Sequence, residues 1–164
     1  MDIKKIKIKV KKILSKHRYE HTISVAKFAK KLALINGVNE EKAYLAGLLH
    51  DIAKEFSLNE IISLTKDDPN FSKYPNVKTL HGLAGAYYAS KFLKIDDKEV
   101  LNAIKNHVIP PKKCSKLSMI IYIADKLDPN RKKYYNIANS EKYKILAQKN
   151  ITKCFTELYK IMRK

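Results

Sequence analysis

Histidine and aspartate side chains are the residues of this sequence whose types and order could do chemistry. The pair at positions 50 and 51 ends an apolar run that starts at Ala43. Burying an isolated imidazole or carboxylate costs free energy unless a partner or a metal compensates it. Imidazoles and carboxylates together are typical ligands of divalent first-row metals. The set that falls on the inward faces or ends of predicted helices is His21, His50, Asp51, His81, His107 and Asp125.

This set is large enough for two ions if Asp51 bridges them. The first ion would be held by His21, His50, Asp51 and Asp125. The second ion would be held by Asp51, His81 and His107. The alternative is that all six are structural residues, as a single inward histidine usually is. Four inward histidines with two carboxylates are hard to satisfy by hydrogen bonds alone in a core of this size, so we favour the metal site.

Lys54 indicates that the metal site also takes an anion. His50 and Lys54 are four residues apart and share one face of a helix that continues through both. A lysine aimed at a cation would be repelled unless an anion lies between them. We therefore expect Lys54 to contact a phosphoryl group and to neutralise charge that grows on it during catalysis. Asp51 is the second expected catalytic residue, through the ions that it bridges.

The elements that must position these residues are all predicted helices, because the apolar residues recur at helical spacing and no strand pattern stands out. The fold class is therefore all-α, a compact helical bundle with residues 1–164 as one domain. Its first segment, residues 1–16, is a basic helix packed on the rest. The predicted helices span residues 2–16, 18–36, 40–53, 58–65, 79–92, 98–108, 116–127 and 140–162.

Apolar stripes along these helices predict which side chains are buried. The stripe of the second helix contains His21 and ends at Ile35, and the stripe of the helix that starts at Thr79 contains His81 and ends at Phe92. In the final helix, Ile145 and Ile161 are among the expected core residues.

Composition limits the class of protein. The chain has 164 residues, of which 45% are hydrophobic and 30% are charged, with only 4 Gly and 5 Pro, so it is expected to be globular. No apolar run approaches the roughly 20 residues of a membrane span. Cys114 and Cys154 lack metal-type or redox spacing and are interpreted as reduced thiols of a cytoplasmic protein.

The formal net charge of +18 indicates acidic partners such as nucleotides, nucleic acid or an anionic surface. Most lysines are scattered, and only the N-terminal helix concentrates them. That helix could lie on a membrane or on nucleic acid, but packing on the domain is favoured because nothing aromatic anchors it. The clustered lysines are Lys4, Lys5, Lys7, Lys9, Lys11 and Lys12.

The order His21, then His50-Asp51, then a distant Asp125, resembles the HD-domain metal-dependent phosphohydrolases. Within them it is most similar to the YqeK-type symmetrical bis(5'-nucleosyl)-tetraphosphatases. The similarity covers residues 10–160, and the ordered set is specific although His-Asp alone is common. It is carried by Arg18-Tyr19-Glu20-His21-Thr22, by residues 46–55 (Ala-Gly-Leu-Leu-His-Asp-Ile-Ala-Lys-Glu), by residues 81–86 (His-Gly-Leu-Ala-Gly-Ala) and by residues 122–131 (Tyr-Ile-Ala-Asp-Lys-Leu-Asp-Pro-Asn-Arg).

The resemblance implies two divalent metal ions, often iron, with Mn, Zn or Mg as alternatives. It also implies cleavage of diadenosine tetraphosphate into two molecules of ADP, and a substrate contact at Gly82. We expect a metal-bound hydroxide to attack phosphorus and Arg131 to clamp a phosphate, with Arg18 as a second candidate. The alternative for Arg131 is an ion pair with Asp128 across the turn.

Two departures from the family pattern affect the substrate rather than the metal set. Residues 108–111 are Val-Ile-Pro-Pro where the family has a Thr-Thr-Gly-Arg-like turn, so an expected arginine is absent and Lys112 or Lys113 would have to replace it. Asp128 stands where the family has a glutamate.

Other readings therefore stay open. They are a different HD-type nucleotide phosphohydrolase or phosphodiesterase, a nucleic-acid-binding helical module, or a nucleotide sensor with slow turnover. The base preference, adenosine or guanosine, and the oligomeric state, a homodimer included, are left open too. No membrane partner and no specific nucleic acid are expected.

Overall fold

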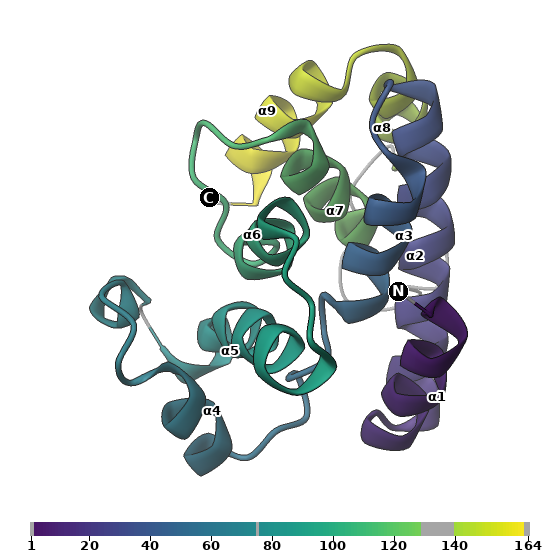
Figure 1. The fold of residues 1–164 in the computed structure, drawn as a ribbon. Helices are drawn as coiled ribbons and strands as arrows, with labels where there is room; N and C mark the ends of the chain where they lie inside the picture. The colour runs from purple at the N-terminus through teal and green to yellow at the C-terminus, as the bar shows by residue number, and fades with distance from the viewer. Residues whose placement is uncertain (1, 75, 129–139, 163–164) are drawn as a thin grey trace.

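The computed structural model describes residues 2–74, 76–128 and 140–162, and every regular element in these ranges is helical (Figure 1). The all-α prediction is therefore confirmed. The elements are α1 (Ile3–Ile13), α2 (Lys16–Ile35), α3 (Glu40–Leu49), α4 (Leu58–Thr65), the short 3-10 helix η1 (Phe71–Lys73), α5 (Val77–Leu93), α6 (Lys98–Asn106), α7 (Lys116–Lys126), α8 (Ser140–Lys149) and α9 (Ile151–Ile161). Among the described residues, none of these helices is both long and apolar enough to cross a membrane.

Side-chain caps fix where the helices begin. Ser15 accepts a hydrogen bond from the Arg18 amide at the start of α2, and Asp97 accepts from two amides at the start of α6. Ser57 and Glu60 form a reciprocal capping box at the start of α4. These contacts satisfy amides that the first turn of a helix leaves without a partner.

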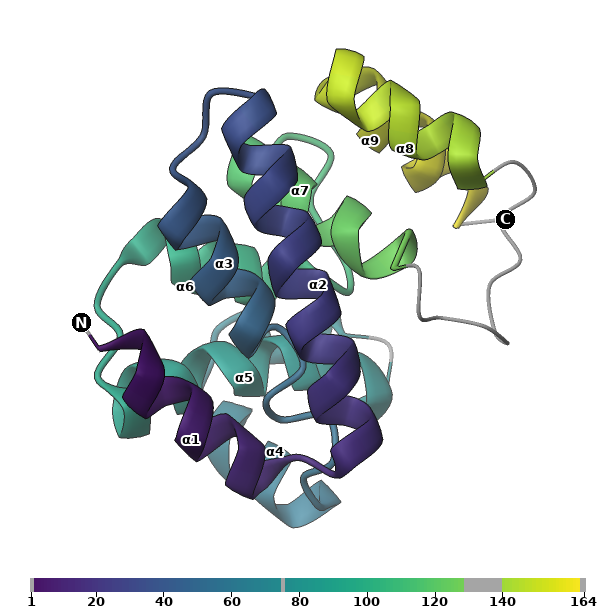
Figure 2. The ribbon, with the colours of Figure 1, turned by 90° about the vertical axis from the view of Figure 1, so that its right-hand side faces the viewer.

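The main core lies between α2, α3, α6 and α7, which bury side chains such as Leu32, Leu48 and Ile121 completely (Figure 2). Gly47 lets α3 approach α2 closely, because an added Cβ would lie 2.8 Å from the Cα of Ala26. This contact sets the distance between the helix that carries His21 and the end of the helix that precedes His50.

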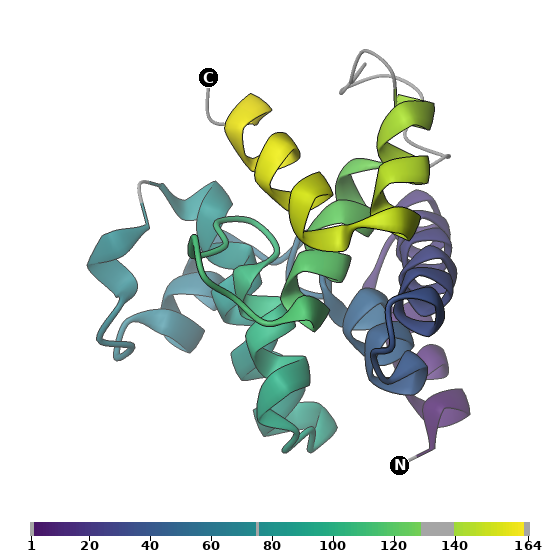
Figure 3. The ribbon, with the colours of Figure 1, turned by 90° about the horizontal axis from the view of Figure 1, so that it is seen from above.

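Two peripheral units flank this core. The first is α4 and η1, which lie at one side of the molecule and share a small separate core with α5 around Ile61 and Leu83 (Figure 3). The second is α8 and α9, which pack on each other, with α9 against α7, and add side chains such as Leu158 to the main core. The N-terminal helix α1 packs on α2 and α3 and buries Ile6 and Val10, while Ile8 remains 58% exposed.

Three sequence predictions about the elements are wrong. The final helix is broken at Asn150, whose side chain caps α9 by accepting from the Lys153 amide. The third helix ends at Leu49 rather than at residue 53, because residues 50–55 form successive turns. Four predicted core residues at helix ends or on outer faces are exposed by 43–49%: Ile35, Phe92, Ile145 and Ile161.

Candidate metal centre

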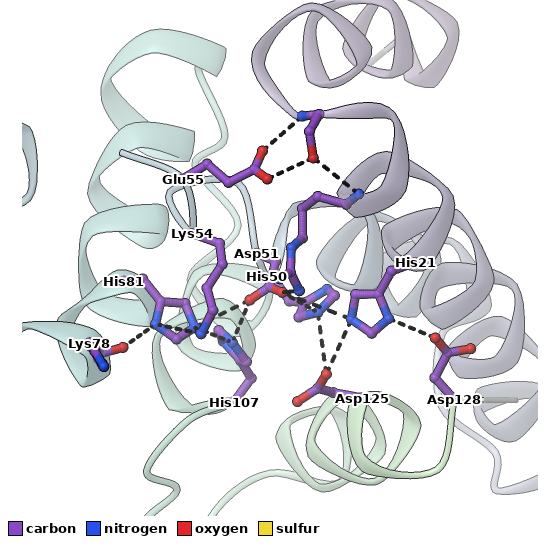
Figure 4. Close-up of polar contacts among 12 residues, drawn as sticks. His21, His50, Asp51, Lys54, Glu55, Lys78, His81, His107, Asp125 and Asp128 are labelled. Atoms are coloured by element: carbon purple, nitrogen blue, oxygen red, sulfur yellow. Dashed lines mark hydrogen bonds and ion pairs between the residues drawn. The ribbon is translucent and has the colours of Figure 1, made fainter. Parts of the chain in front are cut away.

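Five separate segments bring the six predicted ligand residues together around Asp51 (Figure 4). His21 comes from α2, His50 and Asp51 from the turn after α3, His81 from α5, His107 from the end of α6 and Asp125 from α7. All six are at least 94% buried. His17, which is four residues before His21, is exposed and takes no part.

The two oxygens of Asp51 face two different pairs of imidazoles. Its Oδ1 lies 3.2 Å from His81 Nε2 and 3.4 Å from His107 Nε2. Its Oδ2 lies 3.9 Å from His21 Nε2 and 3.7 Å from His50 Nε2. The possible ligand atoms of Asp51 and either pair all lie within 4.8 Å of one another, so each group could hold a metal ion.

Asp125 belongs to only one of these groups. Its Oδ1 lies 3.4 Å from His21 Nε2 and 3.7 Å from His50 Nε2. We therefore define the first ion site as His21, His50, Asp51 and Asp125, and the second ion site as Asp51, His81 and His107. This is the division that the sequence predicts.

The imidazole rings are oriented by acceptors behind them. His50 Nδ1 lies 2.7 Å from the Gly47 carbonyl, and His107 Nδ1 lies 2.7 Å from the Ile104 carbonyl. These carbonyls belong to the last turns of α3 and α6, where backbone oxygens lack an amide partner within the helix. His81 Nδ1 contacts the Lys78 carbonyl in the same way. Because an oxygen acceptor requires a proton on Nδ1, each of the three rings would present the lone pair of Nε2 to a bound cation.

The geometry around Nε2 fits a bound cation. His81 Nε2 and His107 Nε2 lie 3.1 Å apart. With both Nδ1 atoms used as donors, two neutral rings would face each other with their lone pairs, an arrangement that favours a positive charge near them. Lys54 Nζ, 3.3 Å from His81 Nε2, supplies one such charge, and a bound cation would supply another. In the first site, His50 Nε2 is buried without a hydrogen-bond partner among the described residues. The donor set of imidazoles and carboxylates also suits a divalent metal.

In the metal-free centre, burial and neighbouring charges shift the pKa values of three candidate ligands. Burial raises the pKa of Asp51, but the surrounding imidazoles of His50, His107 and His81 outweigh it and hold that pKa well below 3.8. Burial lowers the pKa of His21, but the carboxylates of Asp125 and Asp128 raise it overall, to about 9. Burial lowers the pKa of His107 to about 4. The carboxylates that hold a proton on His21 in the metal-free centre would equally attract a cation in its place, whereas His107 is neutral at neutral pH.

Two cationic side chains border the centre. Arg18 Nη1 donates to Asp51 Oδ2 across 2.8 Å. Lys54 Nζ lies 3.3 Å from His81 Nε2, and burial lowers the pKa of this amine.

The expectation that Lys54 shares a helical face with His50 is wrong, because the helix ends before His50. A turn with a hydrogen bond from the Lys54 amide to the Asp51 carbonyl brings the lysine to the second ion site instead.

The other predicted substrate contacts have different surroundings. Gly82 is buried, and a Cβ added there would lie 2.8 Å from the Lys105 carbonyl, so this glycine allows α5 and α6 to approach each other. Lys112 and Lys113 are exposed in the segment between α6 and α7. Arg131 lies outside the residues that the structure describes. Substrate contacts at Gly82 and Arg131 stay predictions.

Comparison with known proteins identifies the family. The model of the HD domain matches residues 18–130, which is more than half of the chain. The chain belongs to the HD-domain family.

Similar HD-domain proteins include named hydrolases. The chain is 42% identical over 123 residues to a probable nicotinate-nucleotide adenylyltransferase/Ap4A hydrolase of Mycoplasma genitalium, covering 75% of this chain and 35% of that protein. It is 38% identical to a symmetrical bis(5'-nucleosyl)-tetraphosphatase of Halalkalibacterium halodurans, covering 74% of this chain and 66% of that protein. The chain thus spans about a third of the first relative and about two thirds of the second.

A solved structure of an HD-domain protein has the same fold. The crystal structure of a predicted HD superfamily hydrolase involved in NAD metabolism from Clostridium acetobutylicum superposes with a TM-score of 0.83 at 33% identity. The match covers 94% of this chain and 81% of that chain.

Sequence reasoning missed the contacts that two carboxylates make beside the candidate ligands. Asp128 Oδ2 lies 2.6 Å from His21 Nδ1, and Asp128 Oδ1 accepts from Ser24 at 2.6 Å. Glu55 accepts from both the amide and the hydroxyl of Ser15, at 2.8 and 2.7 Å. The sequence holds one signal for Asp128. It follows Asp125 by three residues, so a helix continued to residue 128 would place both side chains on the same face. No comparable signal in the sequence links Glu55 to Ser15, which are 40 residues apart.

Proposed function

We propose that this protein hydrolyses symmetrical dinucleoside tetraphosphates, converting diadenosine tetraphosphate and water into two molecules of ADP. The carboxylate of Asp51 carries the proposal, because each of its oxygens faces one pair of imidazoles, so that two ion sites would share this one side chain. The names of the relatives support the choice of substrate.

The first and second ion sites would hold two divalent cations, which supply a water nucleophile activated near neutral pH and positive charge for the phosphoryl oxygens. Water adds to one of the two central phosphorus atoms, and the bond from that phosphorus to the central bridging oxygen breaks. One ADP leaves with the bridging oxygen and the other keeps the oxygen of the water. The two protons of that water pass to solvent as both ADP molecules become fully ionised. ADP is already a stable leaving group, so the site does not need a strong general acid.

Residues of the chain would bind and orient the polyphosphate. Lys54 Nζ borders the second ion site and would donate to a phosphoryl oxygen of the transition state. Arg18, now on Asp51, would turn its guanidinium to the phosphate chain. Arg131 is proposed as a further phosphate contact.

We propose iron as the metal, with Mn, Zn or Mg as alternatives, since a mixed imidazole and carboxylate set accepts several divalent ions. The proposal includes a nucleotide as the substrate, leaves a homodimer open, and treats residues 1–164 as one HD domain. It also includes a cytoplasmic location, which the free thiols of Cys114 and Cys154 support.

The first experiment is a metal analysis of protein purified without added metal, followed by separation of the products from diadenosine tetraphosphate by ion-exchange chromatography. ADP as the sole nucleotide product is expected. AMP together with ATP would refute the symmetrical assignment. A panel of nucleoside monophosphates and cyclic dinucleotides tests the alternative of a different HD-type phosphohydrolase or phosphodiesterase.

A further inference from the structure

The four imidazoles of the centre do not share one type of support. His50, His81 and His107 each rest Nδ1 on a backbone carbonyl three residues earlier in the chain. His21 rests Nδ1 on a side chain from another segment, the carboxylate of Asp128, at 2.6 Å. Asp128 is buried, and its second oxygen is held by the hydroxyl of Ser24. The first ion site therefore contains an imidazole backed by a full negative charge, and the second does not.

We propose that Asp128 is a positioning residue that makes the two ion sites unequal, so that the first ion site binds its cation more tightly than the second. The inference rests on the proposed metal centre. It goes further by ranking the affinities of the two ion sites and by giving a role to a residue that is not itself a ligand.

The charge distribution points the same way. The first ion site has Asp51 and Asp125 as ligand carboxylates, with Asp128 behind His21. The second has only the shared Asp51, and Lys54 Nζ lies 3.3 Å from one of its imidazoles. Lys126 Nζ, 2.6 Å from Asp125 Oδ2, and Arg18 offset part of the negative charge at the first site. Among the contacts that the structure describes, the carboxylate behind His21 leaves more negative charge around the first ion site than around the second.

A carboxylate acceptor also fixes the ring of His21 more firmly than a neutral acceptor. A hydrogen bond to a charged acceptor is roughly twice as strong as a bond between neutral groups. It holds the proton on Nδ1 and turns Nε2 toward Asp125 and Asp51. Ser24, three residues after His21 on the same helix, keeps the carboxylate in place from the other side.

The test is a calorimetric titration of the metal-free protein with Mn²⁺ alone. Two phases are expected for the unaltered chain. Asp128→Asn should weaken the tighter phase by about 10–100-fold, the usual effect of losing a residue that supports a metal ligand, and leave the weaker phase unchanged. Asp128→Glu should recover most of the lost affinity, because it restores a carboxylate. Asp68→Asn is the matched control, since Asp68 is also a buried, hydrogen-bonded carboxylate but contacts Tyr87, Asn70 and Lys105 rather than an imidazole.

The outcomes separate this inference from the proposed function. Equal weakening of both phases by Asp128→Asn, or the same result for Asp68→Asn, overturns the positioning role while hydrolysis to ADP stands. A single phase in the unaltered chain overturns the unequal pair. Absence of any Mn²⁺ binding removes the metal centre and the proposed function with it. If Asp128→Asn loses its helical circular dichroism, Ser24→Ala replaces it and should weaken the same phase to a smaller extent.

Discussion

Arg18 donates from Nη1 to Asp51 Oδ2, the oxygen that also faces His21 and His50, across 2.8 Å. A guanidinium at this distance balances part of the negative charge of a carboxylate that is almost fully buried. The same guanidinium is the group best placed to exchange that contact for a phosphate, because arginine binds both anions with the same planar array of donors.

Arg18→Gln should raise the KM for diadenosine tetraphosphate by roughly tenfold or more, because a hydrogen bond to a charged group contributes about 1.5–3 kcal/mol. The metal content of the variant should stay at the level of the unaltered protein. Steady-state kinetics and metal analysis of the same sample check both. An unchanged KM with lost metal would assign Arg18 to the support of Asp51 instead of the substrate.

Asp51→Ala should lose both ions and the activity, because the two ion sites share this carboxylate. It should also lower the free energy of unfolding by about 3–5 kcal/mol, since Arg18 and two pairs of imidazoles are left without their common partner. Chemical denaturation and metal analysis measure the two effects. Asp51→Asn keeps the volume of the side chain and serves as the control for the fold. Activity retained in Asp51→Ala would rule out the bridging role.

Gly47→Ala should destabilise the protein by about 1–3 kcal/mol, the usual cost of forcing an extra carbon into a packed core. The added Cβ would meet the backbone of Ala26 at 2.8 Å and push α3 from α2. Because His50 follows the end of α3 and His21 lies on α2, metal affinity should fall as well. Gly37→Ala is the comparison: its φ of +67° is strained for alanine, but no atom lies within 4 Å, so it should affect stability and leave metal affinity alone. Equal metal affinity in Gly47→Ala and the unaltered protein would contradict this coupling.

The metal-free protein should lose stability as the pH rises from 6.5 to 9. The carboxylates of Asp125 and Asp128 overcome the effect of burial and raise the pKa of His21 from 6.5 to about 9. Since the folded pKa lies above the unfolded one, the contribution of His21 is complete below pH 6.5 and is lost as the pH rises through 9. Urea denaturation across this range, with His21→Asn as the reference that cannot titrate, isolates the contribution. A difference between the two proteins that does not change with pH would show that the folded His21 binds its proton no more tightly than the unfolded chain does.

The contact between Glu55 and Ser15 should couple the turn after α3 to the start of α2. Ser15→Ala and Glu55→Gln should each destabilise the protein, and a double-mutant cycle should give a coupling of about 0.5–1.5 kcal/mol, as expected for hydrogen bonds on the surface. Denaturation curves of the two single variants and the double variant supply the cycle. Strictly additive effects would mean that the contact does not join the two segments energetically.

The helices and their inward ligands could be predicted because the local pattern is strong. Asp125 and His107 each continue an apolar stripe, and both are buried where the stripe places them. Helix ends were harder to predict, because capping competes with a continuous periodic pattern. Asn150 ends one apparent helix and starts another, and Ile145 and Ile161 then fall outside the core.

The contacts between the ligands and their supports depend on tertiary packing that the sequence does not encode locally. Asp128 reaches His21 from 107 positions away, and Glu55 reaches Ser15 from 40. The sequence predicts Lys54 beside the metal site through a shared helical face with His50. In the structure a turn brings Lys54 to His81 instead. Residue types and helical position located the candidate ligands, while their orientation required coordinates.

Carbonyls three residues earlier aim the rings of His50, His81 and His107, so each of these donor atoms is directed by a stretch of only four residues. Those stretches keep their shape wherever the surrounding helix survives. Heating should therefore change the distances between these stretches before it changes the orientation of any single ring within its own stretch. Ions would be released when the helices drift apart, at temperatures where each helix is still intact.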